Sequence, residues 1–191
     1  MKFHDLYKKL EKTRLFVFSI NNLLMLFPDE SVESLKVMLY RWKTDGKVKT
    51  LKNGLYELCY PRDLTLPDLY IANKLYNPSY VSLQTALSIY SIIPEVSMSV
   101  TSVTTKTTRK FKNSHGSFFF RTIKPEYFAG YRITDYNGFY VFIAEPEKAV
   151  IDFLYLNNEK YRFDMDVIKE LSKSKLNKYS KLMKVDLHKL C

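Results

Sequence analysis

The acidic, histidine and cysteine side chains of this sequence lack the spacing that catalysis or metal binding requires. Asp29, followed by Asp45 and Lys47, formally matches a metal-dependent nuclease signature, whose second acid and lysine must lie on a strand beside the first acid. Asp45 is expected to end a helix and Lys47 to open a hairpin, so we interpret the match as chance. The three histidines are isolated from one another and from the two cysteines. We therefore predict no catalytic residue, no metal site and no cofactor, and a protein that is not an enzyme.

The basic side chains, in contrast, are concentrated in parts of the chain. The 191 residues include 30 Lys or Arg and 20 Asp or Glu, a formal net charge of +10. Residues 1–62 hold 12 basic and 7 acidic side chains, a net +5, and residues 96–125 hold six basic and no acidic ones. Such segregation attracts polyanions, although a lysine-rich solvated surface explains it equally well.

The composition is that of a globular protein, with 46% hydrophobic and 26% charged residues. Cys59 and Cys191 cannot form a disulfide framework and are too few for a structural zinc site, which favours a reducing compartment. Residues 1–14 are charged throughout, unlike a signal peptide, and the apolar stretch over residues 15–27 is too short to span a bilayer. We expect a cytoplasmic protein without a membrane partner.

The first sixty residues are expected to form helices and strands that position basic side chains for a partner. Apolar spacing predicts three helices, over residues 3–11, 19–27 and 31–44, and three short strands, over residues 15–18, 47–51 and 55–59. Gly46 is expected to end the third helix, and Asn53-Gly54 to close a hairpin in which both residues take positive φ. This order is that of a winged helix-turn-helix, so we predict such a DNA-binding domain over residues 1–62.

The helix predicted over residues 31–44 has one apolar stripe and one polar side. Its apolar stripe consists of Leu35, Met38, Leu39 and Trp42. In helix-turn-helix docking the second helix lies in the major groove, and its outward residues meet base edges. The residues that we predict to face DNA are Ser34, Lys36, Val37, Tyr40 and Arg41. The residues expected to contact phosphates from the helix end and the wing are Lys43, Lys47, Lys49 and Lys52. Winged helices also bind proteins, so the alternative is a protein-interaction module without a specific DNA site.

Residues 63–191 are predicted to form a second domain of α+β type with a small antiparallel sheet. Its strands are expected from the alternation over residues 97–105, the aromatic run at 118–120 and the hairpin at Asn137-Gly138. Helices are expected over residues 69–75, 82–90 and 146–156. A helical tail beyond residue 161 is expected to pack through its apolar side chains, Val167, Ile168, Leu171, Leu182 and Val185.

Five blocks of this second region carry a family resemblance. In chain order they are residues 79–87 (SYVSLQTAL), 93–95 (IPE), 101–106 (TSVTTK), 128–131 (FAGY) and 144–152 (AEPEKAVID). With a winged helix in front of them, the chain resembles the AbiEi-type antitoxins of abortive-infection (type IV toxin–antitoxin) systems over about 150 residues. It departs from them at Ser91, where relatives often carry glycine after the helix.

The resemblance implies two roles and two partners. In that family the winged helix represses its own operon, so the first implied partner is double-stranded operator DNA with inverted repeats. The second domain is required to neutralise a nucleotidyltransferase toxin, so the second implied partner is an AbiEii-like toxin encoded next door. The basic group Lys106, Arg109, Lys110 and Lys112 corresponds to the family only as a region. It is expected either to contact DNA, an RNA or the toxin, or to form a solvated loop after a strand.

Overall fold

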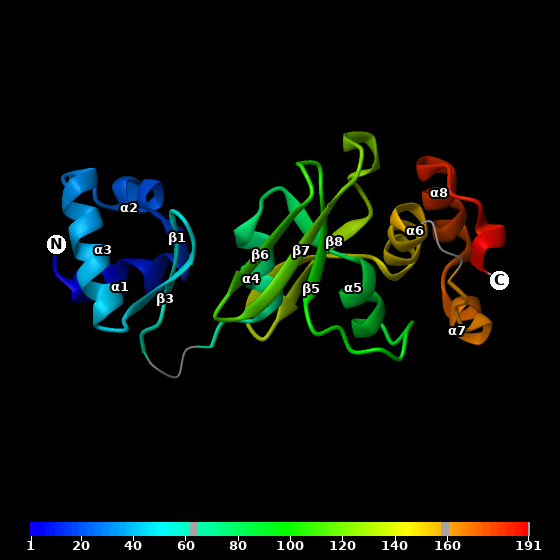
Figure 1. Cartoon of the computed structure of the whole chain (residues 1–191), viewed down its shortest axis with the longest axis horizontal. Helices are drawn as coiled ribbons and strands as arrows, with labels where there is room; N and C mark the ends of the chain where they lie inside the picture. The colour runs from blue at the N-terminus through cyan, green and yellow to red at the C-terminus, as the bar shows by residue number, and fades with distance from the viewer. Residues whose placement is uncertain (62–64, 158–160, 191) are drawn as a thin grey trace. The chain divides into compact units, whose positions relative to one another are not determined.

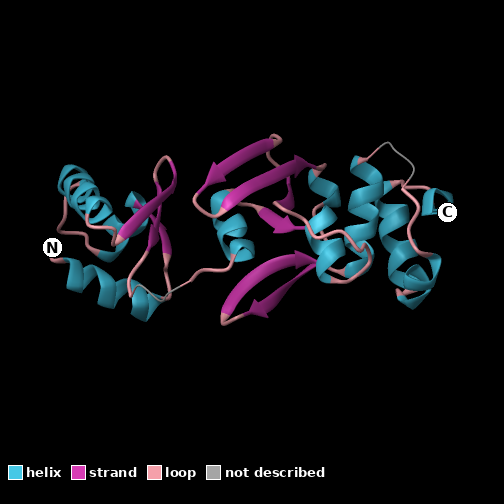
Figure 2. Ribbon diagram, turned by 60° about the horizontal axis from the view of Figure 1, so that its bottom comes forward, coloured by secondary structure: helices cyan, strands magenta, loops and turns pink. Residues whose placement is uncertain are grey.

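The computed structural model describes residues 1–61, 65–157 and 161–190, and the chain divides into two compact units, Met1–Leu66 and Pro67–Cys191 (Figure 1). Both units combine helices with a sheet, so the chain is an α+β protein (Figure 2). The predicted boundary between residues 62 and 63, and Cys191, lie outside the described residues. Among the described residues, no helix has both the length and the apolar character to cross a membrane.

The first unit places three helices against a three-stranded antiparallel sheet. Its elements are α1 (Phe3–Thr13), β1 (Val17–Ser19), α2 (Ile20–Leu26), α3 (Val32–Thr44), β2 (Val48–Lys52) and β3 (Leu55–Leu58). The strands lie in the order β1-β3-β2, so β3 is central. Leucines of α1 and α3 pack with Trp42 and with Val48 and Leu58 of the sheet in one core. This shared core holds α3 against the rest of the first unit, including the β2–β3 hairpin.

The β2–β3 hairpin differs in its turn from the one predicted. Gly54 has φ +76°, but Asn53 does not take the positive φ that a tight two-residue Asn-Gly turn requires. The register also shifts by one residue between Thr50 and Lys52, which is a β-bulge. Because of this extra residue, only Gly54 in the turn takes the left-handed conformation, and Asn53 does not.

The second unit is built on one six-stranded sheet. Its helices and strands are α4 (Asp68–Leu75), β4 (Ser79–Val81), α5 (Leu83–Ile89), β5 (Val100–Thr104), β6 (Arg109–Asn113), β7 (Gly116–Thr122), β8 (Tyr131–Tyr136), β9 (Phe139–Ala144), α6 (Pro146–Leu156), α7 (Met165–Glu170) and α8 (Lys173–Met183). Two short 3₁₀ turns cover Pro125–Tyr127 and Leu187–Leu190. The strand order is β6-β7-β5-β4-β9-β8.

The prediction of a small antiparallel sheet in this second unit was wrong. The sheet is mixed, because β5 pairs in parallel with β7 and β4 pairs in parallel with β9, while the remaining pairs are antiparallel. Both parallel pairs join strands that are not neighbours in sequence. A hairpin signal reports only on adjacent strands, so it cannot reveal such pairings.

Helices cover opposite faces of the central strands. Tyr76, after α4, packs on Phe120 of β7 with ring centroids 5.3 Å apart. On the other face, Lys148 of α6 contacts Tyr80 of β4. Tyr80 pairs with Val103, and Val103 pairs with the residue that follows Phe120, so the side chains of Tyr80 and Phe120 point to opposite faces of the sheet. Helix α6 also packs on α5 and α8.

The C-terminal tail packs through a set of residues that differs in part from the predicted one. Ile168 and Val185 are buried as expected, whereas Leu182 is 37% exposed. Leu176, Tyr179 and Met183 bury the inner side of α8 instead. These three residues recur at spacings of three and four, which places them on one side of α8.

Helix α5 ends in a strained C-terminal turn. Ser91 has φ +56°, the amide of Ile92 donates to the carbonyl of Leu87 (2.8 Å), and the amide of Ser91 donates to the carbonyl of Ser88 (3.0 Å). These two bonds form the Schellman arrangement, in which glycine is the usual residue at the left-handed position. Ser91, where the sequence departs from the AbiEi-type pattern, therefore adopts a backbone conformation that is unfavourable for a residue with a Cβ.

Replacing Ser91 by glycine should stabilise the protein by about 1 kcal/mol, because glycine adopts the left-handed conformation without a Cβ clash. Urea unfolding followed by circular dichroism would measure the change. Ser88→Gly, inside α5, is the matched control and should destabilise the protein, since glycine is unfavourable in a helix interior. An equal loss of stability from both variants would contradict the assignment of strain to Ser91.

Candidate nucleic-acid interface

Helix α3 is stabilised by an N-cap hydrogen bond and by its buried apolar stripe. The side chain of Ser31 caps it by accepting a hydrogen bond from the amide of Ser34 (3.1 Å). Leu35, Leu39 and Trp42 are buried, and the Trp42 ring packs edge-on against Phe3 of α1 at 5.6 Å. Because these contacts fix the rotation of α3 about its axis, they also decide which side chains point outward.

The outward side of α3 carries four of the five side chains predicted to face DNA. Lys36, Val37, Tyr40 and Arg41 are all exposed, Val37 by 52% and Tyr40 by 74%. Their spacing of three and four residues places them in one row along the helix. Ser34 is half-buried, and its hydroxyl donates to Glu30 (2.8 Å), so it lies at the edge of this row.

The lysines of the helix end and the hairpin differ in their surroundings. Lys43 and Lys49 are exposed, whereas Lys47 and Lys52 are half-buried. The Lys47 ammonium lies 3.0 Å from Asp45 and 5.1 Å from the centre of the Phe3 ring. Asp45 and Lys47 of the nuclease-like signature are therefore partners in an ion pair at the end of α3. Among the described residues, no group of three or more His, Cys, Asp or Glu side chains is placed to hold a metal ion.

The basic group of the second unit lies largely on an edge strand and not in a loop. Arg109, Lys110 and Lys112 belong to β6, so the expectation of a solvated loop was wrong for these three. Side chains alternate along a strand, which puts Lys110 and Lys112 on one face and Arg109 on the other. The contacts agree, because Lys110 lies over the Phe119 ring (4.7 Å) while Arg109 and Lys106 lie over Tyr76 (5.8 and 5.5 Å). The structure therefore does not bring the four together on one face.

A buried charged network in the second unit was not predicted. Lys148 and Asp152 form an ion pair with both side chains fully buried. The Tyr80 hydroxyl donates to Asp152 (3.0 Å) and accepts from Lys148 (2.8 Å), and the Ser82 hydroxyl donates to Asp152 (2.8 Å). Burial lowers the pKa of Lys148 and raises the pKa values of Asp152 and Tyr80. No side chain of the network reaches solvent, so it links α6 to β4 and is closed to a substrate.

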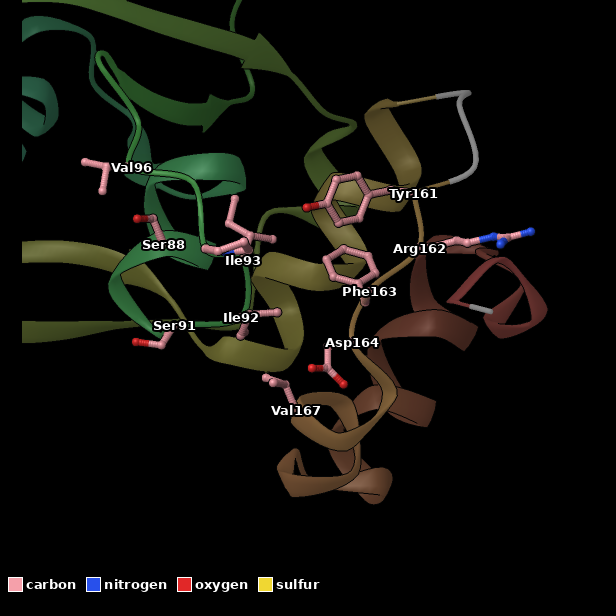
Figure 3. A pocket seen from close by; sticks show the side chains of 11 residues that line it. Ser88, Ser91, Ile92, Ile93, Val96, Tyr161, Arg162, Phe163, Asp164 and Val167 are labelled. Atoms are coloured by element: carbon pink, nitrogen blue, oxygen red, sulfur yellow. The ribbon is translucent and has the colours of Figure 1, made fainter.

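A pocket of about 660 Å³ lies between the end of α5 and the segment before α7 (Figure 3). Its walls mix apolar and polar side chains, with Ile92 and Ile93 facing Phe163 across the space. Asp164 accepts a hydrogen bond from the amide of Asp166 (2.9 Å) as the N-cap of α7, and Arg162 extends away from the cavity.

Comparison of this chain with protein-family models and with curated proteins finds no match.

Replacing Lys148 by methionine should destabilise the protein by about 3–5 kcal/mol, because the Asp152 carboxylate would stay buried with only hydroxyl partners. The double variant Lys148→Met/Asp152→Leu should lose less than the sum of the two single losses, since neither charge remains. Urea unfolding of all three variants measures this coupling.

The matched control is Lys169→Met, which breaks the Lys169–Asp166 pair (2.8 Å) on the exposed side of α7. That pair is open to solvent, so its loss should leave stability nearly unchanged. Additive losses at Lys148 and Asp152 would show that the buried ion pair does not couple the two residues.

Proposed function

We propose that the protein is a DNA-binding antitoxin and transcriptional autorepressor of a toxin–antitoxin operon. The observation that carries the first part is the exposed row Lys36, Val37, Tyr40 and Arg41 on α3, next to a hairpin that bears exposed Lys49. The element order of the first unit and its sheet order β1-β3-β2 fit a winged helix-turn-helix.

In this proposal α3 enters the major groove and the β2–β3 hairpin follows the backbone. A B-DNA major groove about 12 Å wide admits one helix, and arginine is the side chain that most often pairs with guanine there. Tyr40 and Val37 supply apolar contact with base edges, while Lys43 and Lys49 reach phosphates. The net charge of +5 over residues 1–62 adds the long-range attraction that such binding uses.

The antitoxin part of the proposal rests on the resemblance to AbiEi-type proteins. It assigns the second unit the role of counteracting an AbiEii-like nucleotidyltransferase toxin encoded beside this chain. Operators with inverted repeats would be read by two copies of the first unit, one on each half-site. A nucleotidyltransferase gene next to this one, toxic alone and harmless when this chain is co-expressed, would support the assignment.

A protein-interaction module is the second candidate, favoured by the exposure of Val37 and Tyr40 on α3. Tyrosine is a frequent anchor of protein interfaces. Selection from a random DNA pool separates the two candidates. An enriched motif supports the repressor, whereas the absence of any motif together with stable co-purification of a neighbour-encoded protein supports the interaction module.

Arg41→Ala and Tyr40→Ala should each weaken binding to the DNA upstream of the gene by about 5- to 150-fold, because each removes a contact to base edges. Lys49→Ala should weaken binding to all duplexes alike and reduce the slope of log K against log salt by about one. Fluorescence anisotropy at several salt concentrations measures both effects.

The control for Lys49→Ala is Lys8→Ala. It also removes one exposed lysine, but from α1, outside the proposed face. It should leave the affinity for upstream DNA close to that of the unaltered protein. Normal operator binding by both the Arg41 and the Tyr40 variant would reject α3 as the reading helix.

A further inference from the structure

One face of the β8–β9 hairpin displays large apolar side chains to solvent. Ile133 pairs across the hairpin with Phe142, and Asp135 pairs with Tyr140. Ile133 is 62% exposed and Tyr140 is 68% exposed. On the opposite face Val141 and Ile143 are buried. The hairpin thus contacts the core through these two β9 residues on one face and leaves the other face open.

The open face is held against the core at the start of β8, which is called its inner end. The Tyr131 ring stacks on buried Tyr80 with centroids 4.8 Å apart and lies edge-on to Phe142 at 6.0 Å. Tyr131, Ile133, Tyr140 and Phe142 together are called the aromatic strip here. The charged network holds Tyr80, so the inner ring of the strip sits on a fixed support. Rings that are fixed before binding lose little conformational entropy when a partner stacks on them.

Helix α8 adds positive charge beside the inner end of the strip. Its exposed lysines, with no acidic residue from position 171 to position 185, are Lys173, Lys175, Lys178, Lys181 and Lys184. A Cβ on Gly130, next to Tyr131 in the chain, would lie 2.7 Å from the Tyr179 ring of α8. The Lys178 ammonium lies 5.6 Å from the centre of that ring, and Lys175 pairs with Glu145 (3.1 Å) just after β9. The basic helix and the aromatic strip therefore adjoin.

We propose that the aromatic strip and the α8 lysines form a binding surface for single-stranded nucleic acid. Stacking needs base faces, which only an unpaired strand offers, and the rings of Tyr140 and Phe142 are open to receive them. The exposed lysines of α8 match the phosphates of the same strand. An apolar protein partner would use the strip but would leave the lysine charge of α8 without a counterpart, so the combination favours the polynucleotide. Both RNA and single-stranded DNA present this chemistry.

The test uses the full chain and fluorescence anisotropy with three labelled probes: a 12-nucleotide oligo-U, a 12-nucleotide oligo-dT and a 12-base-pair duplex of unrelated sequence. Tyr140→Ala should weaken binding of the single strands by about 5- to 150-fold, the loss expected for one stacked base. Lys178→Ala/Lys181→Ala should reduce the salt dependence of that binding. Comparison of oligo-U with oligo-dT tells whether the 2′-hydroxyl contributes.

Two controls separate this surface from the proposed duplex-reading face. Tyr136→Ala changes the same residue type on the same hairpin, but its side chain points to the opposite face, so single-strand affinity should be retained. Tyr40→Ala should impair binding of the duplex upstream of the gene and leave single-strand binding intact, so failure of one proposal does not imply failure of the other. The inference is overturned if neither oligonucleotide binds, or if Tyr140→Ala and Tyr136→Ala bind equally well. It is also overturned if Tyr140→Ala abolishes association with a partner protein and leaves oligonucleotide binding unchanged.

Discussion

The buried Lys148–Asp152 pair is the constraint on which the second unit depends. Two opposite charges without solvent must satisfy each other and their remaining hydrogen-bonding capacity. The observed placement of α6 on β4 does so through Tyr80 and Ser82. Ser82 is the N-cap of α5, yet its hydroxyl serves Asp152, and the next residue, Leu83, takes φ +57°. The network therefore sets the start of α5 as well as the position of α6.

The sequence carried a readable signal for this network. A Lys and an Asp four residues apart on a helix are typical of an exposed ion pair. In α6, however, all residues from Glu147 to Leu154 are buried, so the pair lies inside the protein. The apolar run Ala149, Val150 and Ile151 between the two charges indicates that they also lie inside.

Local patterns predicted the first unit better than the second. The apolar stripe of α3 is a property of one helix, and its spacing indicated the exposed side chains Lys36, Val37, Tyr40 and Arg41 before any coordinates. The sheet of the second unit depends on pairs such as Val81 with Ile143, which join distant parts of the chain through a strand of three residues. A strand so short has too few side chains to show a period, so its neighbours cannot be inferred from sequence.

Counting charge along the chain finds basic segments but does not tell which of them form a surface. Consecutive lysines and arginines in β6 fall on alternate faces, so the segment with the highest local positive charge is divided between two sides of the sheet. In α8 the lysines at 175, 178 and 181 recur every three residues, a spacing that keeps them on one side while Leu176, Tyr179 and Met183 face inward. Secondary structure, more than charge density, thus makes one side of α8 basic. Gly130 brings the start of β8 against Tyr179, so the β8–β9 hairpin begins beside α8.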